Sequence, residues 1–124
     1  MKIQKASQDY LEAMLICKEK HGYIRSIDVA EYVGVTKASV SYSTKRLREN
    51  GYIVMDKDGL ITLTEKGMEI ASSMYERHKA LTGFLMNLGV SEEIAREDAC
   101  RIEHDISDEI FNAICRHVHE KLGK

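Results

Sequence analysis

Cys100, Glu103 and His104 are the residues of this chain whose types and spacing point most directly to chemistry. A thiol, a carboxylate and an imidazole are all ligands of divalent metal ions. Residues three and four positions apart lie on one face of a helix, so the spacing predicts that these side chains, the metal-ligand triplet, converge within one turn. The alternative is structural, with Cys100 buried as a small hydrophobic residue, Glu103 solvated and His104 acting as a cap. The elements around the triplet must decide between the two.

The composition is that of an ordinary folded protein. The chain has 124 residues, of which 44% are hydrophobic and 31% charged, enough for one domain or two small lobes and unlike a disordered chain. Its apolar runs are short and its N-terminus lacks a signal-peptide core, so we expect no membrane association and a cytoplasmic location. Cys17, Cys100 and Cys115 have no disulfide-framework spacing, so we expect reduced thiols, with Cys17 and Cys115 in the core.

Charge and histidine are distributed unevenly along the chain. Residues 1–60 hold ten Lys and Arg against eight Asp and Glu, a balance of +2. Residues 61–124 hold eight against twelve, a balance of −4, together with four of the five histidines. Nucleic-acid backbones attract cations, so any contact with nucleic acid is expected in the first half.

Three helices are predicted in the first half of the chain. The first runs from residue 7 to about residue 20, where apolar positions repeat at helical spacing. The second covers residues 27–33 with Ser26 as its N-cap, and the third covers residues 37–50 with Thr36 as its N-cap. A short turn containing glycine joins the last two, which is the helix-turn-helix arrangement. The residues expected to hold these two helices together are Ala30, Val33, Val35, Val40 and Leu47.

The exposed face of the 37–50 helix is predicted to read DNA. It carries cations, small hydroxyl groups and one aromatic ring, which contact phosphate oxygens and base edges in a major groove. A merely solvated helix would place more carboxylates among its cations, and here only Glu49 does so. The predicted DNA contacts on this element are Thr36, Lys37, Ser39, Ser41, Tyr42, Lys45 and Arg46.

A β-hairpin is predicted directly after these helices. Residues 52–55 and 60–63 are rich in β-branched and apolar side chains, and an Asp58-Gly59 turn lies between them. A hairpin in this position is the wing of a winged helix-turn-helix, and Lys57 at its tip is expected to reach a phosphate. The two elements together predict binding to double-stranded DNA.

The second half is predicted to be entirely helical. A long helix from residue 64 to about residue 88 begins at the capping residue Thr64, Ser91 opens the helix that carries the metal-ligand triplet, and Ser107 opens the last helix. The apolar stripe of this last helix consists of Ile110, Phe111, Ile114, Val118 and Leu122.

The predicted fold class is therefore mainly α, with a winged helix-turn-helix domain at residues 1–64 and an all-helical domain at residues 65–124. In this order of parts, the chain resembles the metal-dependent transcriptional repressors typified by the diphtheria toxin repressor and the manganese transport regulator. The segments that carry the resemblance are Asp9-Tyr-Leu-Glu12, residues 29–52, Leu63-Thr-Glu-Lys-Gly67, Arg77-His78 and residues 100–107.

The resemblance implies a metal-responsive regulator that is not an enzyme. It implies a homodimer that binds operator DNA and represses genes for manganese or iron uptake, with a divalent metal as corepressor. It also implies that the helical domain binds the metal and dimerises. A primary metal site is assigned by resemblance to Asp9, Cys100, Glu103 and His104, and a second site to Glu12 and His78.

The donor set combines features of two branches of this family. Asp9 and Glu12 resemble the manganese regulators, whereas Cys100 resembles the iron regulators, because the manganese type has a carboxylate there. A thiolate favours later transition metals, whereas Asp, Glu and His suit Mn²⁺ and Fe²⁺ about equally well, so the identity of the metal remains open between these two. Zn²⁺ and Co²⁺ can bind in vitro. One or two ions per subunit are possible. Thr82 and Arg96 stand where the iron regulators have ancillary ligands.

Two other functions remain as alternatives. One is a winged-helix regulator that senses no metal, in which the residues of the second half only pack. The other is a small metal-dependent hydrolase with Glu103 as its base, although the chain lacks the His-Glu-x-x-His, Gly-x-Ser-x-Gly and P-loop patterns. A response of DNA binding to metal distinguishes the expected regulator from both.

Overall fold

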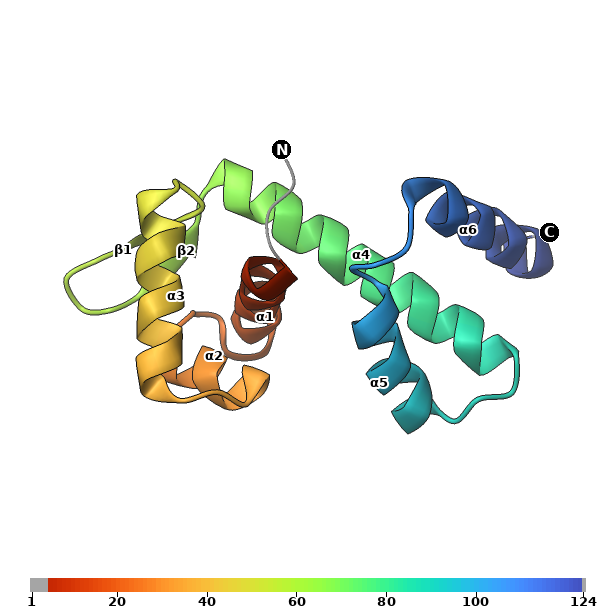
Figure 1. Cartoon of the computed structure of the whole chain (residues 1–124), viewed down its shortest axis with the longest axis horizontal. Helices are drawn as coiled ribbons and strands as arrows, with labels where there is room; N and C mark the ends of the chain where they lie inside the picture. The colour runs from red at the N-terminus through yellow and green to blue at the C-terminus, as the bar shows by residue number, and fades with distance from the viewer. Residues whose placement is uncertain (1–4, 124) are drawn as a thin grey trace. The chain divides into compact units, whose positions relative to one another are not determined.

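Residues 5–123 are described by a computed structural model, with side chains described through residue 119. The chain forms two units, Met1–Ser73 and Met74–Lys124, and the boundary falls inside the long helix α4 (Glu65–Asn87) (Figure 1). Our division of the domains between residues 64 and 65 stays a prediction. The fold class is confirmed, because six helices and one two-stranded sheet make up the described chain.

The first unit is a winged helix-turn-helix. The first helix packs against the second, the second against the third, and the third against the first strand of the hairpin. These elements are α1 (Lys5–His21), α2 (Ser26–Val33), α3 (Lys37–Glu49), β1 (Ile53–Met55) and β2 (Ile61–Leu63).

The core of this unit contains the residues that the helical pattern predicted. Ala30, Val40 and Leu47 are buried in it, and Val33 and Val35 pack against it. Side chains from α1 and from the hairpin belong to the same cluster, so the apolar side of α1 packs against both α2 and α3. Its most deeply buried members include Leu11, Met14, Ile24, Val29 and Ile53.

The helix caps agree with the predictions except at α2. Thr36 caps α3 by accepting a hydrogen bond from Ser39 N at 3.1 Å, and Gly34 ends α2 in the left-handed conformation with φ 84°. Ser26, however, is the first helical residue and not the N-cap. Arg25 occupies the cap position in an extended conformation, because its backbone bridges to Leu60 beside the hairpin.

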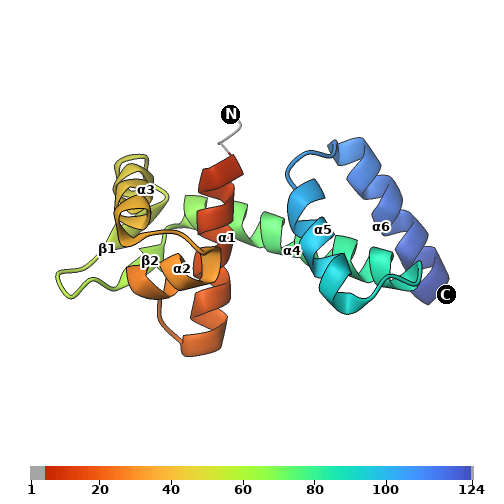
Figure 2. The same cartoon turned by 60° about the horizontal axis from the view of Figure 1, so that its bottom comes forward.

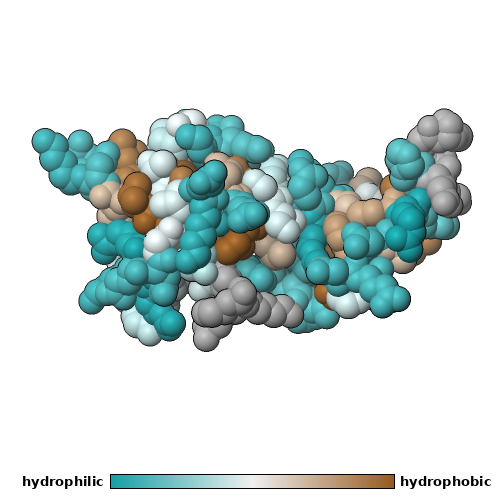
Figure 3. All heavy atoms as spheres, turned by 90° about the horizontal axis from the view of Figure 1, so that it is seen from above, coloured by the Kyte–Doolittle hydropathy of each residue, from teal (hydrophilic) through white to brown (hydrophobic). Residues whose placement is uncertain are grey.

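The hairpin is antiparallel and its tip is held by one side chain. Val54 pairs with Thr62, and Asp56 Oδ1 accepts hydrogen bonds from Asp58 N and Leu60 N, both at 2.9 Å. Gly59 takes φ 84°, which the turn requires. The exposed tip is the hydrophilic projection at the left of Figure 3.

The start of α4 is fastened to the segment before β1. Thr64 Oγ1 accepts a hydrogen bond from Gly67 N at 3.1 Å and donates to the carbonyl oxygens of Gly51 and Tyr52, at 2.7 and 2.9 Å. Gly67 lies directly against this segment, because a Cβ added to it would stand 2.0 Å from the Tyr52 carbonyl oxygen. A side chain at residue 67 is therefore excluded by the main chain.

The second unit consists of the later part of α4 with α5 (Glu92–Ile102) and α6 (Asp108–Gly123), as Figure 2 shows. Leu81, Ala95 and Ala99 are completely buried. Ser91 and Ser107 open α5 and α6 by accepting hydrogen bonds from backbone amides three residues later, which confirms both predicted caps. None of the helices in residues 5–123 is long and apolar enough to cross a membrane.

The cysteines are only partly as predicted. Cys17 is buried in the core, where burial and the nearby Asp28 carboxylate raise the pKa of its thiol. The prediction that Cys115 lies in the core is wrong, because its side chain is half-buried on α6.

Candidate metal centre and nucleic-acid interface

Glu103 is a fully buried carboxylate with an imidazole beside each of its oxygens. Its Oε1 lies 3.1 Å from His78 Nδ1, and its Oε2 lies 3.3 Å from His104 Nε2. The side chains of Glu103 and His104 are 0% and 1% exposed, so both are shielded from solvent. A buried carboxylate needs such partners, because the loss of hydration would otherwise disfavour its charge. The helical spacing alone had not predicted this burial.

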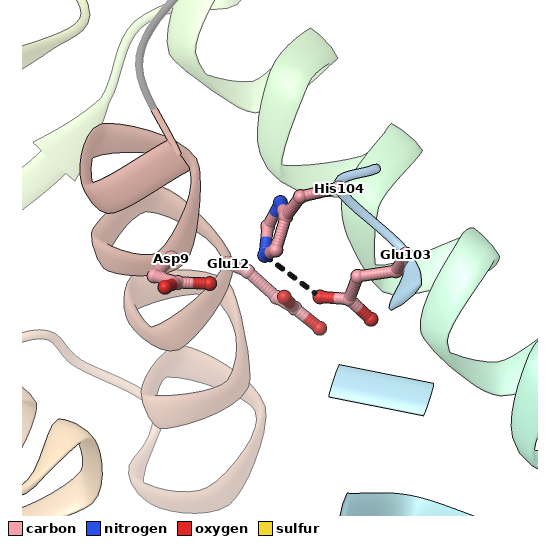
Figure 4. A group of neighbouring side chains, drawn as sticks. All are labelled: Asp9, Glu12, Glu103 and His104. Atoms are coloured by element: carbon pink, nitrogen blue, oxygen red, sulfur yellow. Dashed lines mark ion pairs between the residues drawn. The ribbon is translucent and has the colours of Figure 1, made fainter. Parts of the chain in front are cut away.

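The structural alternative for the metal-ligand triplet is contradicted at two of its residues. Glu103 is buried instead of solvated, and Cys100 is exposed instead of packed as a small hydrophobic residue. The prediction that the three side chains lie on one continuous helix is also wrong, because α5 ends at Ile102 and Glu103 occupies its C-cap position. His104 follows in the turn that leads to α6 (Figure 4).

Asp9 and Glu12 are presented by α1. They stand three residues apart, so they share one side of the helix, and Figure 4 shows both carboxylates projecting from it. Glu12 is 6% exposed and Asp9 is partly buried, whereas a purely solvated pair would stand in water. These positions make the pair available as carboxylate ligands from the first unit.

The turn that carries Glu103 and His104 is held by Arg77, which was not among the predicted site residues. Arg77 Nη1 donates to the carbonyl oxygens of Glu103 at 3.1 Å and Ile106 at 3.3 Å, and Nη2 donates to Asp108 Oδ1. Arg77 did belong to the Arg77-His78 segment that carries the family resemblance. An arginine in a helix rich in charged residues is nevertheless expected to face solvent, so its sequence context did not predict that it is buried.

The positions of the ancillary ligands hold other groups. Arg96 is exposed and forms an ion pair with Glu92 at 2.6 Å, so a cation occupies this surface. Thr82 Oγ1 is buried without a hydrogen-bond partner among the described residues. A hydroxyl and a guanidinium are poor replacements for carboxylate ligands.

The predicted DNA contacts on α3 are all exposed. Tyr42 is the most prominent, with 63% of its surface accessible, and the Arg46 guanidinium lies 5.8 Å from the centre of its ring. Val40, Thr44 and Leu47 are buried on the opposite side of the helix. The helix therefore presents its cations and the hydroxyl groups of Ser39, Ser41 and Tyr42 outward, and Val40 and Leu47 to the core.

The wing is braced by a residue that the sequence prediction also missed. Arg25 Nη1 donates to the Asp58 carbonyl oxygen at 3.3 Å, and Ile61 N donates to the Ile24 carbonyl oxygen at 2.9 Å. Lys57 is the exposed residue directly before Asp58. The segment before α2 thus holds the hairpin by its backbone and by one side chain.

Comparison with protein families identifies the class. The family model described as the N-terminal DNA binding domain of the iron dependent repressor matches residues 2–61. The model described as the metal binding and dimerisation domain of the same repressor matches residues 64–120. The two models follow one another along the chain and together account for nearly all of it.

Curated relatives agree with this assignment. An HTH-type transcriptional regulator of Methanocaldococcus jannaschii is 37% identical over 109 residues, which cover 86% of this chain and 87% of the relative. The transcriptional regulator MntR of Geobacillus kaustophilus is 38% identical over 109 residues, which cover 88% of this chain and 75% of the relative. The chain belongs to the iron-dependent repressor family, whose members are DNA-binding transcriptional regulators and not enzymes.

Solved structures show the same fold. The manganese regulator SloR has a TM-score of 0.80 and 30% identity, and the match covers 96% of this chain and 55% of that one. A manganese-dependent transcriptional repressor in complex with manganese has a TM-score of 0.80 and 32% identity, with 94% and 52% covered. The chain thus spans about half the length of these structures. Family membership contradicts the hydrolase alternative.

Proposed function

We propose that this chain is a cytoplasmic, homodimeric repressor that binds operator DNA when loaded with a divalent metal, and that it controls genes for Mn²⁺ or Fe²⁺ uptake. The observation that carries the proposal is the buried Glu103 carboxylate with an imidazole beside each oxygen. Nitrogen and carboxylate donors gathered away from solvent are suited to a first-row divalent ion. The similar solved structures of a manganese regulator and of a manganese-dependent repressor support the same conclusion.

The proposed ligands come from both halves of the chain. Two features support the selection: on α1, the Glu12 side chain is buried and that of Asp9 is partly buried, and imidazoles lie 3.1 and 3.3 Å from the two oxygens of Glu103. Carboxylates and imidazoles suit Mn²⁺ and Fe²⁺, while the thiol shifts the preference toward later metals. The proposed set is Asp9, Glu12, His78, Cys100, Glu103 and His104.

The charges of this set suggest how metal controls the protein. Without a cation, the carboxylates of Asp9, Glu12 and Glu103 repel one another, which opposes their approach. A bound divalent cation supplies positive charge that compensates these carboxylates. The metal then attracts ligands from α1 and from the second unit alike, and this restricts the motion of the DNA-binding unit. A shift from a mostly incompetent to a mostly competent ensemble requires differential binding of about 5.5 kcal/mol.

The proposed DNA-binding surface is the exposed side of α3 together with the wing. In a symmetric dimer, two such helices read half-sites about 34 Å apart, which is one turn of DNA. Dimerisation through the second unit is supported by the family model of a metal binding and dimerisation domain, which matches residues 64–120 and so includes most of α6, where Ile110 is an exposed apolar residue. The proposed contacts are Thr36, Lys37, Ser39, Ser41, Tyr42, Lys45, Arg46 and Lys57.

The test is DNA binding at controlled metal. An operator would be selected from a random duplex library in the presence of Mn²⁺, and its affinity measured in chelator and with Mn²⁺, anaerobic Fe²⁺, Co²⁺ or Zn²⁺. We expect strong binding only with metal. Equal affinity in chelator and in saturating metal would refute the proposal and favour the regulator that senses no metal. Activation must be compared, because Zn²⁺ often binds most tightly whichever metal acts in the cell.

The direction of regulation needs a second measurement. A reporter gene placed behind the selected operator should be silenced by the cation that gives the strongest DNA binding. Increased expression under the same conditions would show an activator and contradict the repressor part of the proposal.

A further inference from the structure

We propose that Arg77 is a positioning residue of the metal site, which holds the turn bearing Glu103 and His104 and connects this turn to the start of α6. The inference rests on the proposed function, because it concerns the same site. It assigns a role to a residue that would not touch the metal.

The guanidinium of Arg77 binds three acceptors along one short segment. Two are the main-chain carbonyl oxygens of Glu103 and Ile106, at 3.1 and 3.3 Å, and the third is the carboxylate of Asp108. The Arg77 side chain is only 13% exposed, whereas that of Asp108 is 87% exposed. The arginine therefore approaches the turn from the interior of the unit. Its planar guanidinium has several N–H groups, so it can bind acceptors on three different residues at once.

The segment needs such a partner because α5 has ended. The last carbonyl groups of a helix have no partners within the helix, and the carbonyl of Glu103 lies just beyond Ile102. The guanidinium supplies charged donors to the Glu103 and Ile106 carbonyl groups and acts as a cap from another helix. Without it, these two carbonyls would need water or a different path of the chain.

Two consecutive residues of α4 control the same glutamate. Arg77 binds the main-chain oxygen of Glu103, while His78 Nδ1 lies 3.1 Å from its side-chain Oε1. Both the position of the backbone and the direction of the carboxylate are thus determined from one place on α4. A ligand held in this way is preorganised, which lowers the conformational cost of binding an ion.

Arg77 also contacts the first turn of α6. Its Cζ lies 4.8 Å from the centre of the Phe111 ring, and Asp108 is the first residue of that helix. A displacement of the ligand-bearing turn would therefore be transmitted to the start of α6. Since we propose that α6 takes part in dimerisation, Arg77 joins the metal site to the dimer interface.

The experiment compares Arg77→Lys and Arg77→Met with the matched control Arg96→Met. Arg96 is an exposed arginine whose recorded ion pair is with Glu92 of its own helix. Amide hydrogen exchange of residues 103–108 is measured in the metal-free protein, and Mn²⁺ affinity is measured by calorimetry. We expect faster exchange in both Arg77 variants and affinity weakened by roughly 10- to 100-fold, as for other outer-shell partners of metal ligands. The control should match the wild type in both measurements.

The lysine variant tests whether any loss of metal binding is caused by unfolding. It keeps the charge and most of the apolar stem, so it should stay folded, but a single ammonium cannot hold three acceptors in fork geometry. Wild-type exchange and wild-type Mn²⁺ affinity in a folded Arg77→Lys or Arg77→Met protein would overturn the inference. A lower melting temperature with unchanged affinity would also overturn it, because Arg77 would then act only in stability.

The Mn²⁺ affinities of the wild type and of the Arg77 variants separate this inference from the proposed function. If wild-type protein fails to bind Mn²⁺ or any other cation tested, the proposed function fails, and the metal-positioning role fails with it. If wild-type protein binds and the Arg77 variants bind equally well, the proposed function stands and only the role of Arg77 is rejected.

Discussion

His78 Nδ1 lies 3.1 Å from Glu103 Oε1, and this contact joins the middle of α4 to the residue that directly follows α5. The second oxygen of the same carboxylate faces His104 at 3.3 Å. One buried glutamate therefore has an imidazole close to each of its oxygens, from two different elements, and it is hydrogen-bonded to that of His78. We therefore expect the proposed metal site to depend on Glu103 more than on any other donor of the second unit.

Replacing Glu103 with glutamine should abolish the response to metal. The amide keeps the size of the carboxylate but loses its charge, so Mn²⁺ affinity should fall by more than the roughly 10- to 100-fold that an outer-shell change costs. Calorimetric titration with Mn²⁺ measures the effect. Glu97→Gln, an exposed change on α5, is the control and should bind like the wild type. Normal Mn²⁺ binding by Glu103→Gln would exclude this residue as a ligand.

Metal should protect Cys100 from alkylation if its thiolate is a ligand. Cys100 is exposed, so iodoacetamide reaches it in the metal-free protein, and saturating Mn²⁺ or Fe²⁺ should slow the reaction. Mass spectrometry of each cysteine peptide provides the rates. Cys115, which is half-buried on α6, is the control and should react equally with and without metal.

Cys17 provides a second reference in the same experiment. It is 2% exposed, and burial raises the pKa of its thiol, so little of the reactive thiolate forms near neutral pH. We expect almost no modification of Cys17 in the folded protein under either condition. Equal rates at Cys100 with and without saturating metal would remove the thiol from the ligand set and leave a site of carboxylates and imidazoles.

Much of the fold was predictable because it depends on local chemistry. Thr36 caps α3 with its own hydroxyl group, and the Asp58-Gly59 turn needs only the residues of the turn itself. The end of α5 could not be predicted in this way. Residues 103–106 are Glu-His-Asp-Ile, with no glycine or proline to stop a helix, and the carbonyl of Glu103 is bound by Arg77, which is 26 positions away. The residue types of the site were therefore visible in the sequence, whereas the burial of Glu103 depended on tertiary contacts.

Lys45→Ala should weaken DNA binding in every metal condition. Lys45 is exposed on α3, and a lysine that contacts a phosphate contributes counterion release that does not depend on DNA sequence. The slope of log affinity against log salt should decrease by about 1. Arg96→Ala removes the same charge outside the proposed surface and should leave the slope unchanged. An unchanged slope for Lys45→Ala would remove this residue from the interface.

Arg25 and Lys57 should be energetically coupled in DNA binding. The Arg25 guanidinium donates to the Asp58 carbonyl oxygen at 3.3 Å, so it steadies the tip from which Lys57 extends. A double-mutant cycle with Arg25→Ala and Lys57→Ala should show a coupling of about 0.5 kcal/mol or more. In the Arg25→Ala background, loss of Lys57 should cost less affinity than in the wild type.

The cycle distinguishes two roles for Arg25. If Arg25 contacts a phosphate by itself, each single change lowers the salt dependence of binding and the two costs simply add. Additive costs would therefore contradict a bracing role for Arg25 in the wing. The backbone bridge between Arg25 and Leu60 is retained in both variants, so the hairpin itself should stay paired.

Gly67→Ala should destabilise the protein, and Gly83→Ala should not. Both glycines lie within α4, but a Cβ at Gly67 would stand 2.0 Å from the Tyr52 carbonyl oxygen and 3.0 Å from its carbonyl carbon. Because these are main-chain atoms, the start of α4 or the segment before β1 must shift, at a cost of about 1 to 3 kcal/mol. At Gly83 the added Cβ would meet no described atom within 4 Å apart from its own stretch of helix backbone, so alanine should stabilise the helix by up to about 1 kcal/mol. Thermal unfolding of both variants measures these effects, and a Gly67→Ala protein as stable as the wild type would show that α4 does not start in close contact with Tyr52.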